Sequence, residues 1–282
     1  MTPVLNNVVP HYEQLLDFAY QVINSMKGKP EPDARRLTIE HLALKIFLHA
    51  ATVSYLWRGT KVTLSAYPQG AHVIDFPSAV VITRAILETF LHLFEVFFEH
   101  VDDDEFEYRC AVYELNGLKA LELAVQRNPN PPSATGNDVM KTAMSIQGLQ
   151  KIRERIKQTK FYQTLDPNQQ KSTLDGNLFP KRKLGDVAAV AGFGKTFIDH
   201  TYMYMSSYTH GDSLSAAQTA SAQTDQETDI YFQIYISLIM MVVALLISNY
   251  SQKFSEAKAI CDASPNDMVL VKLLLDEIDK TK

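Results

Sequence analysis

The longest uncharged segment of the chain runs from residue 230 to residue 252 and constrains the fold more than any other feature. Its 23 residues carry no charge, and 17 of them are apolar. A helix of about 20 apolar residues can cross a bilayer. The same pattern is also typical of the central helix of a bundle, which other helices cover on all sides. Gln233, Ser237, Ser248 and Asn249 interrupt the apolar character near both ends and favour the bundle helix.

The charges around this segment point the same way. If the segment crossed a membrane, Lys253 and Lys258 would place its C-terminal side in the cytoplasm and would leave the basic region 151–183 outside. We therefore predict a largely buried central helix in the C-terminal half of the chain. A transmembrane helix at 230–252 remains the minority interpretation, and no membrane partner is favoured.

Helical periodicity dominates the rest of the chain as well. The predicted helices cover residues 12–26, 35–57, 77–100, 102–126, 138–160 and 185–210, with a last helix that starts at Pro265 after the capping residue Ser264. Residues 60–76 contain Pro68 and Gly70 and predict a loop with a short extended piece, while 161–183 and 211–228 predict polar connections. The predicted fold class is all-α, a multi-helix bundle.

The clearest break in the pattern is the run Asn128-Pro129-Asn130-Pro131-Pro132-Ser133. Such a run ends helices and is typical of a linker. Because neither half of the chain has a self-contained pattern, we predict a single helical domain over residues 1–282 with an internal Pro-rich linker near 128–137.

Composition excludes several classes of site. Cys110 and Cys261 are the only cysteines and form no CxxC motif, so neither a disulfide framework nor a thiolate zinc site is expected. Residues 1–10 lack the basic and apolar regions of a secretory signal. These features predict a cytoplasmic protein with no cofactor and no metal site.

The sequence has a local excess of positive charge between residues 151 and 183. This region contains nine basic and three acidic residues, although the chain as a whole has a net charge of −5. A solvated helix face accounts for such a region most simply, and an anion-binding surface is the alternative. The candidate nucleic-acid-binding residues are Lys151, Arg153, Arg155, Lys157, Lys181, Arg182 and Lys183.

Arg84 and Glu88 stand out because nearly all the residues around them are apolar. Four residues apart on a helix, they share a face and can pair. A charge in such surroundings has to be paired or hydrogen-bonded, since an isolated buried ion costs several kcal/mol. The pair either fixes the register of the helix or positions the arginine in an internal cleft.

Tyr202, Ser206 and His210 follow one another at spacings of four, which predicts a slowly drifting stripe on one helix. A hydroxyl one turn before an imidazole can hydrogen-bond to it and select its tautomer. The stripe is either a polar network at the end of the helix or part of a reactive site. No nucleophile elbow or strand accompanies it, which disfavours a Ser-His hydrolase.

Two further patterns carry less weight. The run Ala191-Gly192-Phe193-Gly194-Lys195-Thr196 resembles a phosphate loop, but Ala189 occupies the leading glycine position and residues 184–190 fit a helix at least as well as a strand. Arg36 and His41 have a spacing found in HEPN-type ribonucleases, although one such match is expected by chance in a chain of this composition.

The combination of Arg-x-x-x-Glu at Arg84 and Glu88 with Tyr-x-x-x-Ser-x-x-x-His at Tyr202, Ser206 and His210 resembles a family of HEPN-like, all-helical bacterial proteins. The resemblance covers residues 78–92 and 186–212. It implies a bundle in which the two helices lie side by side, and a homodimer. Because HEPN relatives include toxin and defence ribonucleases, it also implies a role in a bacterial stress or defence system and an RNA or nucleotide partner.

Two function classes follow. The first is a helical-bundle interaction or regulatory protein in which Arg84, Glu88, Tyr202, Ser206 and His210 form a buried polar network. The alternative is a metal-independent ribonuclease-like effector. There His210 would act as general acid and base and Arg84 would stabilise phosphate charge, while Glu88, Tyr202 and Ser206 would position them. The two classes use the same residues. They differ in whether the guanidinium and the imidazole meet at a water-accessible position.

Overall fold

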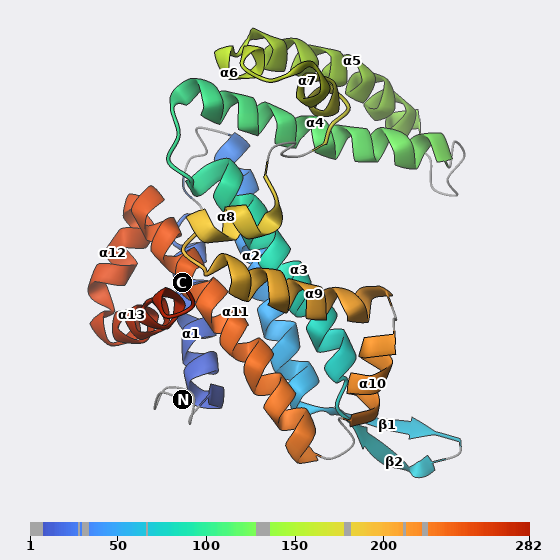
Figure 1. Ribbon diagram of the computed structural model, residues 1–282, viewed down its shortest axis with the longest axis vertical. Coiled ribbons are helices and arrows are strands. Elements are labelled where there is room, and N and C mark those ends of the chain that lie inside the picture. Colours follow the sequence, from blue (N-terminus) through green and yellow to red (C-terminus); the bar gives the residue numbers. More distant parts are fainter. Residues whose placement is uncertain are drawn as a thin grey trace. The chain divides into compact units, whose positions relative to one another are not determined.

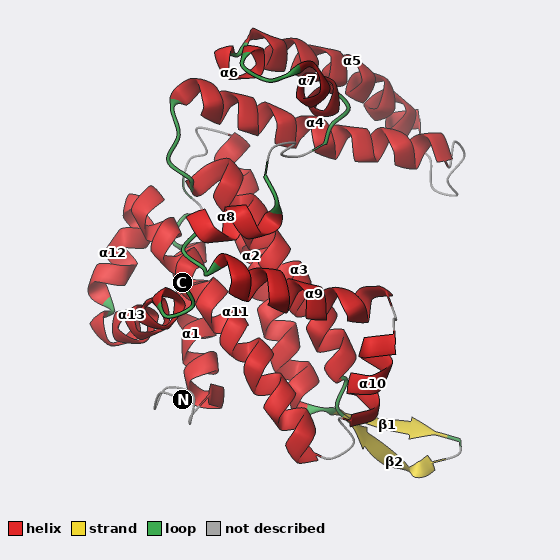
Figure 2. Ribbon diagram, in the orientation of Figure 1, coloured by secondary structure: helices red, strands yellow, loops and turns green. Residues whose placement is uncertain are grey.

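The computed structural model describes residues 8–27, 29, 34–65, 67–127, 136–177, 182–210, 213–221 and 225–282 (Figure 1). Helices make up nearly all of this described part (Figure 2), which confirms the all-α prediction. By their contacts the residues divide into two compact units, which are described separately: residues 1–98 with 184–282, and residues 99–183. The linker predicted near residues 128–137 stays a prediction, because residues 128–135 lie outside the described part of the chain.

The first unit contains most of the elements. They are α1 (Val8–Asn24), α2 (Ala34–Arg58), β1 (Thr60–Leu64), β2 (Tyr67–Val73), α3 (Phe76–Leu93), the π-helix η2 (Phe94–Phe98), α8 (Leu184–Val190), α9 (Lys195–His210), α10 (Ser213–Ser221), α11 (Asp225–Lys253), α12 (Ser255–Ala263) and α13 (Pro265–Asp279). The two strands form an antiparallel hairpin in which Thr60 pairs with Val73. This hairpin is the extended piece expected within residues 60–76.

Helix α11 is the centre of the first unit. It packs against α1, α2, α3, α12 and α13, so the uncharged segment is covered by other helices of the same chain. Every residue from Val242 to Ile247 is buried. Residues 230–253 are long and apolar enough to cross a membrane, and 67% of the most apolar stretch lies inside the protein. The architecture is therefore a bundle around a largely buried helix, as the sequence predicts.

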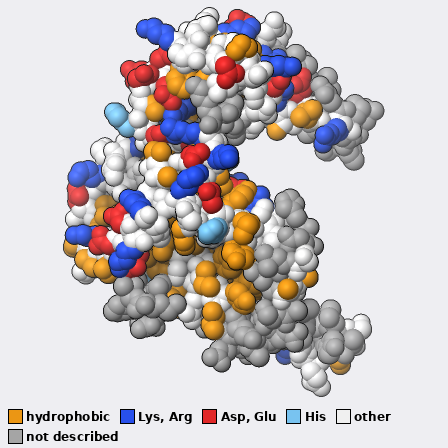
Figure 3. All heavy atoms as spheres, viewed as in Figure 1, with side chains coloured by type: hydrophobic (Ala, Val, Ile, Leu, Met, Phe, Trp, Pro, Cys, Tyr) orange, Lys and Arg blue, Asp and Glu red, His pale blue; other side chains and the backbone are white. Residues whose placement is uncertain are grey.

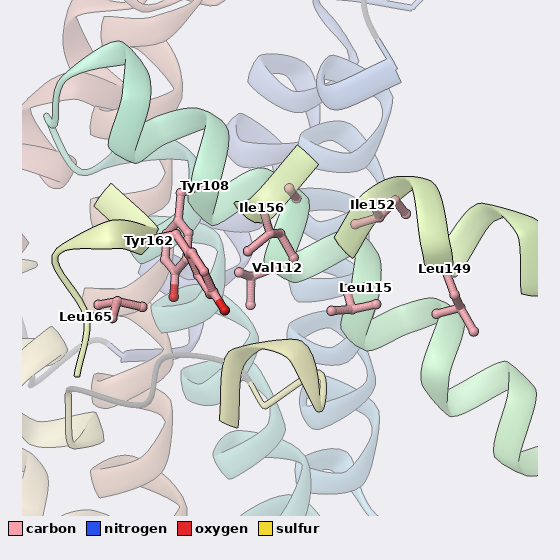
Figure 4. Packing of buried hydrophobic residues seen from close by; sticks show 9 residues of the cluster. Tyr108, Val112, Leu115, Leu149, Ile152, Ile156, Tyr162 and Leu165 are labelled. Atoms are coloured by element: carbon pink, nitrogen blue, oxygen red, sulfur yellow. The ribbon is translucent and has the colours of Figure 1, made fainter. Parts of the chain in front are cut away.

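The second unit consists of α4 (Asp103–Arg127), α5 (Gly136–Gln158), α6 (Lys160–Gln163) and α7 (Pro167–Leu174). Its core lies between α4 and α5, where Tyr108, Val112 and Leu115 meet Ile152 and Ile156 (Figure 4). The helices α6 and α7 occupy a stretch that the sequence analysis assigned to a polar loop. They form because side chains satisfy their first backbone N–H groups: the Asp104 carboxylate accepts from two of them in α6, and Asp166 caps α7.

Other boundaries also differ from the prediction. The helix predicted over 185–210 is interrupted by a turn between Val190 and Lys195, and part of the predicted connection 211–228 forms α10. Ser264 does precede α13, but its side chain makes no capping hydrogen bond.

Candidate functional site: a polar network between α3 and α9

Helix α3 carries Arg84 and Glu88 on a body that is otherwise free of Asp, Glu, Lys and Arg. The helix starts where the Asp75 carboxylate accepts a hydrogen bond from the backbone N–H of Ser78 at 3.1 Å, with Pro77 in the first turn. Its apolar residues pack against α2 and α11, while a further side contacts α9. The two charged side chains emerge on the α9 side, since Arg84 hydrogen-bonds to residues of that helix.

The Arg84 guanidinium donates four hydrogen bonds to side chains of the protein itself. Nε donates to Oε1 of Glu88 at 2.9 Å, Nη2 donates to the hydroxyl of Tyr202 at 2.7 Å, and Nη1 donates to the hydroxyls of Ser206 at 3.2 Å and Thr209 at 3.0 Å. The planar fork of an arginine suits such a fan of acceptors better than an ammonium group would. One residue of α3 therefore holds three residues of α9.

Tyr202 closes the network. Its hydroxyl donates to Oε1 of Glu88 at 2.7 Å, so the carboxylate oxygen that receives Arg84 Nε also receives the tyrosine. The guanidinium carbon lies 4.7 Å from the centre of the Tyr202 ring, within the range of a cation–π interaction. Tyr202 thus contacts both charged residues of α3, and we call Arg84, Glu88, Tyr202, Ser206 and Thr209 the Arg84 network.

The Arg84 network is partly enclosed. The side chain of Arg84 is 17% exposed and that of Glu88 34%. Burial would by itself lower the pKa of Arg84, but the hydrogen bond and charge of Glu88, together with Tyr202, outweigh it and raise that pKa. Burial also raises the pKa of Tyr202, and Glu88 raises it further. The charged guanidinium and the neutral phenol therefore persist at physiological pH.

The sequence analysis identified four of these five residues and missed Thr209. It placed His210 in the stripe instead. Helix α9 ends at His210, but the side chain of His210 lies outside the described residues, so the predicted meeting of Arg84 and His210 stays a prediction. A signal for Thr209 was present: at about 100° per residue, Thr209 lies within about 20° of Tyr202 around the helix, whereas His210 lies about 80° away.

Against known proteins the chain has no match. No family model, no curated protein and no solved structure matches it. The resemblance to HEPN-like proteins therefore remains a prediction, and the function has to be argued from the geometry of the site.

Two histidines on α2 and α3 have pKa values lowered by burial, and one of them, His92, also interacts with Glu88 of the Arg84 network. Burial lowers the pKa of His92, which Lys45 lowers further and Glu88 raises. Burial likewise lowers the pKa of His49, with a smaller effect from Lys45 in the same direction. The Nδ1 atom of His49 is buried and has no hydrogen-bond partner among the described residues. Burial therefore favours the neutral form of both imidazoles in the folded protein.

This burial predicts a loss of stability in acid. Because the folded-state pKa values of His49 and His92 lie below the ordinary value of 6.5, the unfolded chain takes up protons first as the pH decreases. The free energy of unfolding should fall as the pH drops below about 6.5, as measured by urea unfolding at pH 7.5 and 5.5. In a His49→Gln/His92→Gln variant this pH dependence should be smaller. If the pH dependence of stability is as large in this variant as in the wild type, other titrating groups cause it.

Three of the basic residues between 151 and 183 form ion pairs with acids of the same unit, and acidic and basic side chains are interspersed on the visible face of that unit (Figure 3). Arg155 pairs with Glu107 and Glu114 at 2.8 Å each, and Lys157 and Arg182 also form ion pairs. Arg153 donates to a backbone carbonyl, Lys151 and Lys183 are exposed, and Lys181 lies outside the described residues. For Arg155 and Arg182 the paired acids are distant in sequence, whereas Lys157 pairs with Glu154 three residues before it.

The run that resembles a phosphate loop is a turn between two helices. It connects α8 to α9, so a helix and not a strand precedes it. The backbone N–H of Gly194 donates to the hydroxyl of Thr281 at 2.8 Å, and Lys195 Nζ lies 2.7 Å from the Asp186 carboxylate. Its donors are occupied by the protein, which disfavours a phosphate site.

Proposed function

We propose that this protein is a non-catalytic helical-bundle interaction or regulatory protein, and that the Arg84 network fixes α9 on α3. The observation that supports this proposal is the use of the guanidinium by four side chains of the same chain. An arginine that stabilises phosphate charge in catalysis presents its N–H groups to the ligand. Here a ligand would first have to displace the hydroxyls of α9.

One observation favours the alternative, an RNA-directed effector. The Arg84 network is not sealed, since about a third of the Glu88 side chain reaches solvent (34% exposed) and Thr209 is exposed. Exchange of the two weaker contacts, to Ser206 and Thr209, would free Nη1 of Arg84 for a phosphate oxygen without breaking the Arg84–Glu88 pair.

The conservative substitution Arg84→Lys separates the two roles. It keeps the positive charge but replaces the planar fork by one ammonium group, which cannot reach all four acceptors. We expect the purified wild-type protein to leave single-stranded and double-stranded RNA intact, and Arg84→Lys to lower the melting temperature. RNA cleavage by the wild type that is lost in Arg84→Lys at an unchanged melting temperature would refute the proposal and establish the effector.

A further inference from the structure

Helix α2 presents an apolar stripe to solvent on the side opposite its buried face. The buried face consists of Ile39, Ala43, Ile46, Ala50 and Val53, each at most 2% exposed. The second stripe consists of Leu37, His41, Leu44, Leu48, Ala51 and Tyr55, and we call it the α2 seam. At about 100° per residue its centre lies about 160° around the helix from the centre of the buried face.

Four of the six residues of the α2 seam are exposed, and they are spread over its whole length. Leu37 is 40% exposed, Leu48 53% and Tyr55 70%, while His41 is exposed and the two remaining residues are half-buried. None of its six residues is Asp, Glu, Lys or Arg. Helix α12 differs, because it carries the pair Lys258 and Asp262 at 3.3 Å on its exposed side. An uncharged exposed stripe of this length is typical of an interaction surface.

Its spacing specifies a helical partner. Successive residues of the α2 seam are separated by four, three, four, three and four positions. This alternation keeps a seam facing another helix and lets its side chains insert between those of the partner. The ring of Phe47 extends the apolar surface towards α1, where it contacts Tyr20 with 5.2 Å between ring centres.

Two copies of the α2 seam can pack against each other when the two helices run in opposite directions. In an antiparallel pair centred between Leu44 and Leu48, those two residues face each other, so the two copies bring four leucines to the middle. The adjacent layers place the large His41 opposite the small Ala51, and the end layers place Leu37 opposite Tyr55. The pairing of a large with a small side chain in the layers next to the centre favours close packing of the two helices there. A twofold interface usually uses the same patch on both copies.

From this self-complementarity we propose that the α2 seam binds a second copy of this chain, as an antiparallel α2–α2 dimer. The inference rests on the proposed interaction role and names a partner for it, while its own test does not involve the Arg84 network. A single helix pair is a small interface, so a dissociation constant on the order of micromolar is expected.

Lys45 makes the salt dependence of binding a test of self-association. It is exposed beside the seam near its midpoint, so the dimer brings two ammonium groups towards each other. Salt screens such repulsion, and added salt should therefore strengthen the dimer. An acidic helical partner on the same seam would instead bind Lys45 more weakly at high salt.

Sedimentation velocity across a wide range of protein concentration tests the proposal. The wild type should dimerise reversibly, and Leu48→Glu should weaken the dimer by about tenfold or more because it places two carboxylates in the central layers. The matched control is Ile234→Glu on α11, where the replaced side chain is 52% exposed compared with 53% for Leu48. The control should dimerise like the wild type. A wild type that stays monomeric throughout, or a dimer lost in the control and kept in Leu48→Glu, would overturn the proposal.

Cysteine pairing tests the orientation. A mixture of Leu44→Cys and Leu48→Cys proteins should form a mixed disulfide on mild oxidation, whereas each variant alone should crosslink poorly, since position 44 of one copy faces position 48 of the other. Crosslinking of Leu48→Cys with itself in preference to the mixture would contradict the antiparallel arrangement. The native Cys110 and Cys261 are buried and leave the background low.

Discussion

Replacing Arg84 with alanine is expected to lower the free energy of unfolding of the first unit by about 2–4 kcal/mol. The substitution removes four hydrogen bonds at once and leaves Glu88 without its cationic partner in a partly enclosed site. Urea unfolding followed by circular dichroism measures the change.

The matched control is Arg58→Ala. Arg58 also forms an ion pair, with Glu13, but its side chain is 61% exposed. Exposed pairs contribute about 0–1 kcal/mol, so Arg58→Ala should change stability little. Equal effects of the two substitutions would mean that the Arg84 network contributes no more than a surface ion pair.

Introducing a carboxylate at Val243 is expected to prevent the first unit from folding. Val243 is 1% exposed in the centre of α11, and an unpaired charge there should cost about 5 kcal/mol or more. The same change at Ile234, which is 52% exposed on the same helix, should be tolerated. Yield of folded protein and thermal unfolding of Val243→Glu and Ile234→Glu give the comparison.

This pair of variants also tests the minority interpretation of residues 230–252. A helix surrounded by lipid would be damaged by a charge on either side, because both positions would lie in hydrocarbon. The bundle architecture predicts a large difference between them instead. Equal damage at both positions, with the wild-type protein found in membranes, would restore the transmembrane helix.

The sequence predicts the long helices because their apolar periodicity is continuous over many turns. The uncharged segment around Val243 became α11, and the isolated charges Arg84 and Glu88 marked the side of α3 on which α9 packs. These features can be predicted from the sequence because a long apolar segment has to be buried and a charge in apolar surroundings has to be paired.

Short helices and breaks were missed because individual side-chain contacts, and not periodicity, determine them. Helix α6 depends on the carboxylate of Asp104, more than 50 residues earlier in the chain. The break between α8 and α9 contacts Thr281, near the other end of the first unit's sequence. A Cβ at position 194 would lie 1.8 Å from the backbone oxygen of Thr281, so this position requires glycine. No pattern within either segment reveals a partner so distant in sequence.

The candidate site, like the fold, could be predicted only in part from the sequence. The spacing of Tyr202 and Ser206 predicted a stripe facing Arg84, and both residues do bond to it. The sequence continued this stripe four residues further to His210, whose side chain lies outside the described residues, whereas a helix of 3.6 residues per turn returns to the same side after seven. The partner at that position is Thr209.

The most direct test of the Arg84 network is a double-mutant cycle between Arg84 and Tyr202. Arg84→Ala, Tyr202→Phe and the double variant are compared with the wild type by urea unfolding. Tyr202→Phe keeps the ring and removes only the hydroxyl that links the guanidinium to Glu88. If the network clamps α9 to α3, the two substitutions should be coupled by about 1–2 kcal/mol. Additivity to within a few tenths of a kcal/mol would contradict the clamp.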